Sequence, residues 1–486
     1  MVAIKRFFKL EEMGTTVGTE VRAGVVTFMT MAYIIVVQPI VLKEAGMPVG
    51  GVMLATCLSS AIATLMIALL ANYPVAMAPC MGHNFYFAWL VTSGVVPSWR
   101  EALGAIFISG SLFIVLSLFG FRERIMHAVP DSLKYAIAVG IGLLIALVGL
   151  ETAGIVATNA DNPIATGLKV GHFGKPTLLA VLGLGMSGAL LAFRVRGAIL
   201  LGLVATTGIG ILMGLVTPVA SPVSAPPWSE LRQTAFGLDI LGALKLGFVG
   251  VIFTFFFLDL FDAIGTLIAV AQQANLMVDG KLPRAREALL SDAAGTVVGA
   301  VLGTSTVSSY IESTAGVSEG GRTGLASVVT ALLFVAAIFF SPCVYMIAGG
   351  VLTEEKFEFK SVNASWTPDR AAKEPARTLE VAASEPGKLR VRRIKVLSPV
   401  TAPTLILIGC LIMTAVTQIP WKEWTEALPA FLAILMMPLT GNITEGIAFG
   451  FIAHTFLKLV TGRVREVSPW VAVFAVLFVV RYIWLG

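Results

Sequence analysis

Charged residues are scarce in this chain. Asp, Glu, Lys and Arg together make up 13% of its 486 residues, whereas soluble domains carry roughly 25%. Hydrophobic residues account for 57% of the chain, and the mean hydropathy is +0.88. This composition excludes an ordinary soluble domain. Because the length allows many apolar spans of about 20 residues each, we expect a multi-pass protein embedded in the lipid bilayer.

Residues that build metal centres and disulfides are also few. The four cysteines have no CxxC spacing and the four histidines are dispersed, so we expect neither a metal site nor a disulfide framework. No nucleophile stands beside a base in a recognisable arrangement, which disfavours an enzyme. We expect no cofactor.

The N-terminus lacks the features of a cleavable signal peptide. Residues 1–20 are mixed and polar, without a small-residue cleavage site. The first apolar run, at 21–42, is long enough to span the membrane and is expected to stay in the protein. We therefore expect residues 1–20 to form a cytoplasmic segment.

Positive charge gathers in three short loops that are separated by even numbers of expected spans, so all three fall on one side of the membrane. The positive-inside rule makes that side cytoplasmic, together with the N-terminus. The net charge of +5 therefore does not indicate nucleic acid as a partner, and we expect the plasma (cell inner) membrane as the location. The loop cations are Arg122, Arg124, Lys134, Arg194, Arg196, Lys281, Arg284 and Arg286.

Two stretches are too polar for ordinary lipid-facing helices but must also cross the membrane. Residues 75–94 and 304–320 each favour a short extended segment followed by a half-helix, which is tolerated only where protein or water surrounds it. They are third and tenth among the spans, hence third in each of two sets of seven. Such a pair predicts a transporter built as a 7+7 inverted repeat, with the half-helices meeting near the midplane. Ordinary apolar runs lie at 21–42, 50–71, 101–121, 131–151, 176–194, 197–217, 241–274, 323–350 and 399–418.

Two regions are harder to place. Residues 353–397 are rich in charge of both signs and are interpreted as a hydrophilic loop insert on the outer side. Beyond residue 418, three apolar pieces at 428–440, 447–460 and 470–485 give either two or three spans.

Acidic residues inside apolar sequence are the main candidates for function. A carboxylate at membrane depth costs several kcal/mol unless it faces a polar cavity, a partner or a proton. Asp259 and Asp262 are three residues apart, so they share one side of a helix, and Glu312 begins the helical part of the second interrupted segment. Helix capping or pairing with Lys or Arg is the alternative, but few cationic residues lie at membrane depth.

Asn84, on the first interrupted segment, offers both an acceptor and donors. Together with carboxylates and hydroxyls it suits a small planar ligand rich in N–H and C=O groups. A lone histidine such as His83 is more often structural, and Asp259 and Asp292 are left open between proton transfer and support. The substrate-binding candidates are Asn84, Asp262, Glu312, Gly82, His83, Thr266, Tyr310 and Ser313. The proton-coupling candidates are Glu312, Asp262, Asp259 and Asp292.

Several motifs taken together resemble the AzgA-like purine permeases, a branch of the nucleobase/ascorbate transporter family. The resemblance covers nearly the whole chain in order and leaves out chiefly 353–397. Three positions depart from the family's usual pattern, at Cys80, His83 and 442–444. The matching segments read APCMGHN (78–84), DLFDAIGT (259–266), LGTSTVSSYIES (302–313), GRTGL (321–325), MPLT (437–440) and EGIAFG (445–450).

This resemblance implies an all-α polytopic membrane protein of about fourteen spans. It implies a core domain made of 21–121 (spans 1–4) and 241–350 (spans 8–11), and a gate domain made of 131–217 (spans 5–7) and 399–486 (spans 12–14). It further implies uptake of hypoxanthine, guanine or adenine by proton symport with an elevator-like motion. Asn84, Asp262 and Glu312 match the family's substrate-site residues.

Other functions stay open at this point. Uracil or xanthine could be the substrate on the same scaffold, while an anion exchanger is disfavoured because two carboxylates would repel an anion. A channel or a non-transporting receptor that uses the outer loop is the alternative from another class. Coupling to Na⁺ instead of H⁺ and assembly into a homodimer also stay open.

Overall fold

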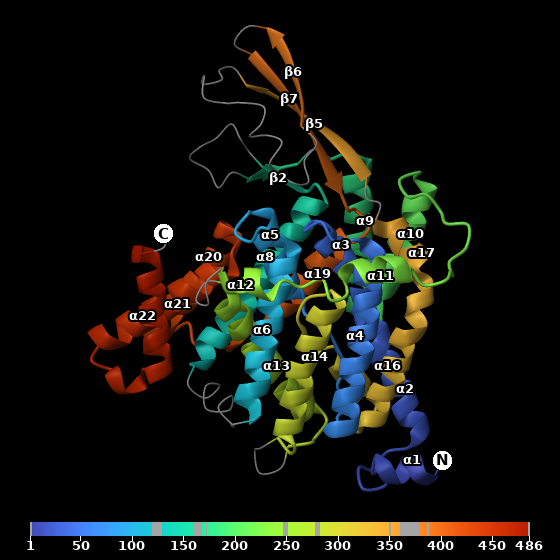
Figure 1. Ribbon diagram of the computed structural model, residues 1–486, viewed down its shortest axis with the longest axis vertical. Helices are drawn as coiled ribbons and strands as arrows, with labels where there is room; N and C mark the ends of the chain where they lie inside the picture. Colours follow the sequence, from blue (N-terminus) through green and yellow to red (C-terminus); the bar gives the residue numbers. More distant parts are fainter. Residues whose placement is uncertain are drawn as a thin grey trace.

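The computed structural model describes residues 2–118, 129–158, 168–171, 173–245, 251–277, 282–348, 351–359, 379–385 and 388–484. Helices dominate this part of the chain (Figure 1). Eight of the described helices are long and apolar enough to cross a membrane. The prediction of a helical, polytopic membrane protein is confirmed.

The described residues of the first half of the chain are mostly helical and include three short strands. Its strands are β1 (Met77–Pro79), β2 (Val156–Thr158) and β3 (Leu168–Val170). Its helices are α1 (Val2–Phe7), α2 (Val17–Met31), α3 (Ile34–Lys43), α4 (Val49–Leu70), α5 (Met81–Thr92), α6 (Trp99–Leu118), α8 (Asp131–Thr152), α9 (Lys175–Ala192), α10 (Ala198–Leu212), α11 (Trp228–Thr234) and α12 (Ile240–Lys245).

The second half adds four strands and a C-terminal group of helices. Its strands are β4 (Val307–Ser309), β5 (Val351–Phe359), β6 (Leu379–Glu385) and β7 (Lys388–Leu397). Its helices are α13 (Phe253–Gln273), α14 (Ala285–Leu302), α15 (Ser313–Ser318), α16 (Gly324–Ala337), η2 (Ile338–Phe340), α17 (Ser341–Ala348), α19 (Ala402–Ile412), η3 (Met413–Gln418), α20 (Trp424–Thr440), α21 (Ile443–Val460), η4 (Val464–Glu466) and α22 (Pro469–Trp484).

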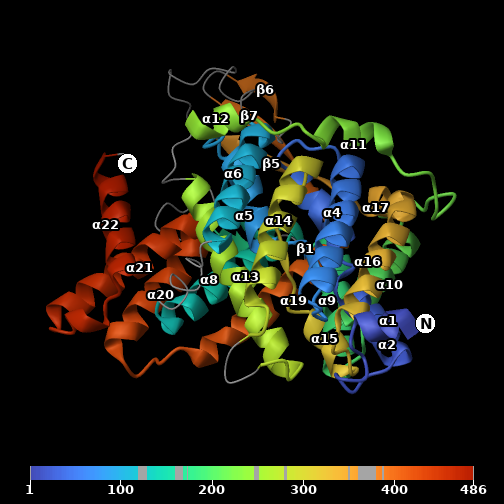
Figure 2. The ribbon, with the colours of Figure 1, turned by 60° about the horizontal axis from the view of Figure 1, so that its bottom comes forward.

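The predicted interrupted segments are present and lie against each other. Strand β1 precedes α5, strand β4 precedes α15, and the two strands pair antiparallel with Met77 opposite Ser309 and Pro79 opposite Val307. Both strands are fully buried, and β1 lies in the middle of the helix bundle (Figure 2). Buried extended backbone keeps its hydrogen bonds in this way because each strand serves as the other's partner.

The apolar run at 241–274, predicted as one span, contains two described helices. Helix α12 ends at Lys245 and α13 begins at Phe253. The Asp239 carboxylate caps α12 by accepting a hydrogen bond from the Gly242 amide (2.8 Å), and the Asp239 amide donates to the Arg100 carbonyl (2.9 Å). These bonds fix α12 beside the start of α6.

The hydrophilic insert, predicted as a loop, contains strands in its described residues. Strands β5, β7 and β6 form an antiparallel sheet in that order. Charged and apolar residues alternate in KLRVR (388–392), which is typical of a strand, but the high charge of the region favours a loop. The sheet and α1 lie at opposite ends of the molecule (Figure 1).

The C-terminal region contains three helices, α20, α21 and α22. Elsewhere the bundle falls into two packing groups. In one group α14 packs on α4 and α6, and α16 packs on α2 and α4; in the other, α8 packs on α19 and α20, and α20 packs on α21. These groups contain the helices assigned to the core and gate domains, whose division stays a prediction.

Candidate functional site

The candidate residues gather where four parts of the chain meet. These parts are the two interrupted segments, the middle of α13, and the break between α2 and α3. Asp262 interacts electrostatically with both Asp292 and Glu312. The structure therefore brings together acidic residues that are far apart in the sequence.

Glu312 stands at the N-terminal end of α15 and is half-buried. The hydroxyl of Tyr33, a buried residue at the break between α2 and α3, donates a hydrogen bond to Glu312 Oε1 (2.7 Å). The contact fixes the carboxylate while leaving further lone pairs free for other donors.

Asp262 lies in the middle of α13 and is also half-buried. The Cys80 thiol, at the N-terminal end of α5, donates to Asp262 Oδ2 (3.0 Å). One turn further along α13, a Cβ added to Gly265 would meet no atom within 4 Å. Open space therefore adjoins Asp262 on its own helix.

Asn84 is completely buried on α5, and its Oδ1 accepts a hydrogen bond from the Ser305 hydroxyl. The neighbouring His83 ring is 2% exposed and stacks on Phe255, with ring centroids 6.5 Å apart. At Gly82, an added Cβ would lie 3.0 Å from Ile141 Cγ2 of α8. Gly82 therefore permits close packing of α5 on α8.

Three of the other predicted site residues lie close by. The Tyr310 hydroxyl donates to the Pro79 carbonyl (2.5 Å), and Ser313 Oγ accepts from the Ala76 amide (3.0 Å). Both side chains therefore fasten one interrupted segment to the other. Thr266 follows Asp262 by one turn of α13 and is buried.

Asp259 and Asp292 are both buried and lie deeper in the structure. Asp292 Oδ1 accepts from the Ser308 hydroxyl (3.0 Å), the Ser309 amide (3.1 Å) and the Ser309 hydroxyl (3.3 Å). The Thr296 hydroxyl lies 3.3 Å from Asp259 Oδ2. The contacts of Asp292 hold strand β4 against α14, which is a supporting role.

Sequence reasoning missed two side chains that contact the site carboxylates. The position of Cys80 was noted only as a departure from the family pattern, although a polar thiol next to a predicted half-helix was a usable signal. Tyr33 had no signal, because it lies in an apolar run 279 residues from Glu312. Among the described residues, no three His, Cys, Asp or Glu side chains are placed to hold a metal ion.

The arrangement is suited to binding hydrogen-bond donors. Two carboxylates, of which Asp262 accepts from Cys80 and Glu312 from Tyr33, lie near each other beside open space. Two carboxylates that are partly shielded from water repel each other unless a proton or an N–H donor lies between them. The site can therefore take up a proton, a ligand with N–H groups, or both.

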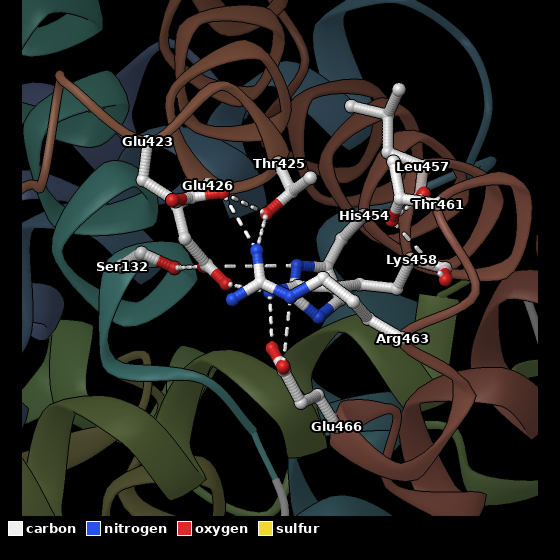
Figure 3. Close-up of polar contacts among 10 residues, drawn as sticks. All are labelled: Ser132, Glu423, Thr425, Glu426, His454, Leu457, Lys458, Thr461, Arg463 and Glu466. Atoms are coloured by element: carbon white, nitrogen blue, oxygen red, sulfur yellow. Dashed lines mark hydrogen bonds and ion pairs between the residues drawn. The ribbon is translucent and has the colours of Figure 1, made fainter.

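A second cluster of charged residues joins α8, α20, α21 and η4 (Figure 3). Lys458 Nζ is buried, 2.7 Å from Glu426 Oε1 and 2.6 Å from Glu466 Oε2. Arg463 pairs with Glu466 (2.8 Å) and with Glu423 (2.7 Å), and the Ser132 hydroxyl donates to Glu426 (2.5 Å). Since each of these three carboxylates is paired, we assign the cluster to holding the helices together.

Relatives of this chain are membrane permeases. A permease of Methanocaldococcus jannaschii is 43% identical over 488 residues, covering 100% of this chain and 99% of its own. The guanine/hypoxanthine permease PbuO of Bacillus subtilis is 39% identical and matches 98% of this chain and 99% of its own. The adenine permease AdeP of Escherichia coli is 37% identical and matches 99% of this chain and 96% of its own.

The fold is also similar to solved structures. The transmembrane domain of the cyanobacterial bicarbonate transporter BicA superposes with a TM-score of 0.56 at 14% identity, covering 88% of this chain and 97% of that domain. At this identity the likeness concerns the fold alone. Residues 18–354 match the family described as the permease family, Xan_ur_permease. The resemblance to purine permeases is confirmed at this level: the chain belongs to that permease family and is a multi-pass membrane transporter, not an enzyme.

Proposed function

We propose that this protein takes up purine nucleobases, among them hypoxanthine, guanine and adenine, by proton symport. The relatives named for guanine, hypoxanthine and adenine transport support the substrate class, since they match this chain over nearly its full length. The location is the plasma membrane, with the N-terminus in the cytoplasm.

The pair of carboxylates carries the proposal. Asp262 and Glu312 come from α13 and the second interrupted segment, and each is positioned by one hydrogen bond from Cys80 or Tyr33. A purine offers N–H groups along its edges, and these carboxylates accept them. A ligand without those groups would leave buried charge unpaired, so the site discriminates against it.

Proton coupling follows from the same two groups. One carboxylate carries the proton, and occupation of the site by proton and purine neutralises it before it moves. The protonmotive force supplies about 2.3 kcal/mol per charge per 100 mV. Asp262 and Glu312 are the first candidates for this proton, with Asp259 and Asp292 behind them because both are fully buried.

The movement is an elevator-like shift of the core helices past the gate helices. In the present conformation Thr444 Oγ1 of α21 lies 3.1 Å from Thr254 Oγ1 of α13. Thr444 also donates to the Tyr86 hydroxyl of α5 (3.3 Å). Such a shift would break these contacts between the two groups of helices.

Uptake measurements test the proposal directly. Radiolabelled hypoxanthine, guanine, adenine and uracil are given to cells that lack their own permeases, with and without a protonophore. Glu312→Gln is compared with Glu319→Gln, a matched change at the other end of α15, whose carboxylate pairs with the exposed guanidinium of Arg196 (2.6 Å). We expect saturable purine uptake that the protonophore and Glu312→Gln abolish and that Glu319→Gln leaves near wild type.

Other outcomes separate the alternatives. Purine uptake that is unchanged by the protonophore would contradict proton coupling and would favour Na⁺ as the coupling ion. Uptake of uracil without purines would move the substrate to another nucleobase. Flux without saturation or competition would indicate a channel, and no uptake despite verified membrane expression would favour a non-transporting receptor.

A further inference from the structure

A chain of buried polar side chains connects α3 to Asn84. Gln38, fully buried within the apolar α3, places its Nε2 3.0 Å from Thr304 Oγ1 and 3.1 Å from Ser305 Oγ. The Ser305 hydroxyl in turn donates to Asn84 Oδ1. A polar residue buried among apolar neighbours is costly unless it is hydrogen-bonded, so the chain needs each of these bonds.

The hydrogen bonds from Gln38 to Asn84 have a fixed direction because an amide nitrogen can only donate. Gln38 donates to Ser305 Oγ, which leaves the Ser305 proton for an acceptor on the other side, Asn84 Oδ1. The amide of Asn84 is therefore turned with its oxygen toward Ser305. Its Nδ2 lies 3.8 Å from Met81 Sδ, a weak acceptor, and so keeps donor capacity for a ligand.

We propose that Gln38 and Ser305 are positioning residues that fix the Asn84 amide so that it donates to the substrate. The inference rests on the proposed function and deepens it. Asp262 and Glu312 accept hydrogen bonds from donors of the base, whereas Asn84 donates a hydrogen bond to an acceptor of the base. A 6-oxopurine such as hypoxanthine supplies both, with N1–H as the donor and O6 or N7 as the acceptor.

Competition by purine analogues tests this division of roles. Inhibition of hypoxanthine uptake is measured for 7-deazahypoxanthine, which lacks the N7 acceptor, and for 6-mercaptopurine, whose sulfur is a poor acceptor in place of O6. The third competitor, 1-methylhypoxanthine, keeps both acceptors but lacks the N1–H donor. Wild type is compared with Ser305→Ala and with Gln38→Met, which keeps the length of the side chain and removes its donors.

We expect wild type to bind hypoxanthine roughly 10-fold more tightly than at least one acceptor-deficient analogue, the effect of one hydrogen bond to a buried group. In both variants that ratio should fall toward one, while discrimination against 1-methylhypoxanthine stays. Ser305→Thr, which keeps the hydroxyl, should restore the ratio. A role in folding alone would weaken all ligands alike.

Thr56→Val is the matched control. The Thr56 hydroxyl lies 3.3 Å from Thr304 Oγ1, in the same buried cluster but off the route from Gln38 to Asn84. Its removal should leave the analogue ratios unchanged, and Thr56→Val also shows how the protein tolerates a lost buried hydroxyl.

Two results would overturn the inference. One is unchanged discrimination against the acceptor-deficient analogues in both Ser305→Ala and Gln38→Met. The other is a selective loss of discrimination against 1-methylhypoxanthine, which would mean that Asn84 presents its carbonyl instead. Absence of purine uptake by wild type in the same assay would overturn the proposed function itself, so the two failures are distinguishable.

Discussion

Cys80 places its thiol 3.0 Å from a carboxylate oxygen of Asp262. A ligand that fills the space beside Asp262 would cover this half-buried side chain. Of the other three cysteines, Cys57 is buried, and neither Cys343 on α17 nor Cys410 on α19 belongs to the elements that form the site. Cys80 is therefore a natural reporter of site occupancy.

We predict that a small methanethiosulfonate reagent inactivates uptake by modifying Cys80. The added group would fill the space at Asp262, so most uptake should be lost, and excess hypoxanthine should slow the loss. Cys80→Ser keeps a hydrogen-bond donor to Asp262 and should resist the reagent. Inactivation of Cys80→Ser at the wild-type rate would show that another cysteine is responsible.

Tyr33→Phe tests the contact that positions Glu312. Loss of a hydrogen bond to a charged group costs about 1.5–3 kcal/mol, so the KM for hypoxanthine should rise by roughly 10-fold or more. Tyr73→Phe is the matched control, because Tyr73 is buried but its hydroxyl has no hydrogen-bond partner in the described part of the chain. Equal KM values for Tyr33→Phe and wild type would refute the positioning role.

For single residues, the sequence predicts which charged side chains belong to the candidate site better than it predicts what those side chains contact. Asp262 and Glu312 stand out because carboxylates are rare in apolar sequence. Tyr33 does not, since a hydroxyl in an apolar run gives no sign of the residue it will meet. The amide orientation of Asn84 depends on Gln38 and Ser305, which belong to other elements, and so could not be inferred from its own neighbours.

Helices α20 and α21 are joined by an ion pair, and the Ser132 hydroxyl of α8 donates to the same Glu426 carboxylate (Figure 3). Lys458 is 2% exposed and pairs with Glu426, which is 17% exposed. Removing Lys458 takes away the cation that compensates Glu426, which is much more costly than the pair is stabilising, whereas removing Glu426 leaves Lys458 paired with Glu466 (2.6 Å).

Lys458→Met should lower the free energy of unfolding by up to about 3–5 kcal/mol, the range for a buried pair, and Glu426→Gln should cost less because Lys458 keeps its pair with Glu466. The double variant should lose less than the sum, since it leaves no unpaired charge between these two positions. Lys134→Met, which breaks an exposed pair with Asp131, should cost at most about 1 kcal/mol. Thermal unfolding of the purified protein in detergent measures all four, and additive losses in the double variant would contradict this account.

The stability that Glu466 and Glu423 of the same cluster contribute to the fold should depend on pH. The pKa of Glu466 is lowered by its bonds to Lys458 and Arg463, and the pKa of Glu423 is lowered by bonds from Thr425 and Arg463. A carboxyl whose pKa is depressed in the folded state stabilises that state above its ordinary pKa of 4.5. This stabilisation is lost as the pH falls below that value and through the folded pKa.

This linkage gives the sign of the change in unfolding temperature that we expect for Glu466→Gln. Its unfolding temperature should lie below that of wild type at pH 7, and the difference should shrink as the pH falls below 4.5. Thermal scans across this range measure the effect, with Glu12→Gln as a control on an exposed residue near the N-terminus. A difference that is constant or grows in acid would contradict the linkage.

Elements differ in how far the sequence predicts them. The interrupted segments were predictable because Gly, Ser and Thr replace apolar residues where a span must continue. The sheet of the insert was not predicted, because its charge was given more weight than its alternation. The position of α12 beside α6 depends on Asp239 and its contact with Arg100, a tertiary interaction that hydropathy does not contain.

On the scale of the whole molecule, the insert is joined to the bundle at two points that lie side by side. Val351 of β5 and Leu397 of β7 are paired residues of neighbouring strands, so their Cα atoms are about 5 Å apart. The sheet can therefore be removed without stretching or displacing α17 and α19.

We predict that replacing 353–395 by a short Gly/Ser linker leaves purine uptake intact. The candidate site lies in the middle of the bundle, whereas the sheet is at one end (Figures 1 and 2). Uptake rates normalised to the amount of protein in the membrane measure the effect. A loss of uptake at normal expression would show that the insert takes part in transport.

The pairing of β1 with β4 also has a consequence for how the protein is made. Pro79 and Tyr310, which meet across this pairing, are separated by 231 residues. The early helices must therefore enter the membrane while β1 has no strand to pair with, an exposed state that invites wrong contacts. Biosynthesis can complete the centre of the molecule only after the ribosome has passed β4, so a chain that stalls earlier has every early helix and no binding site.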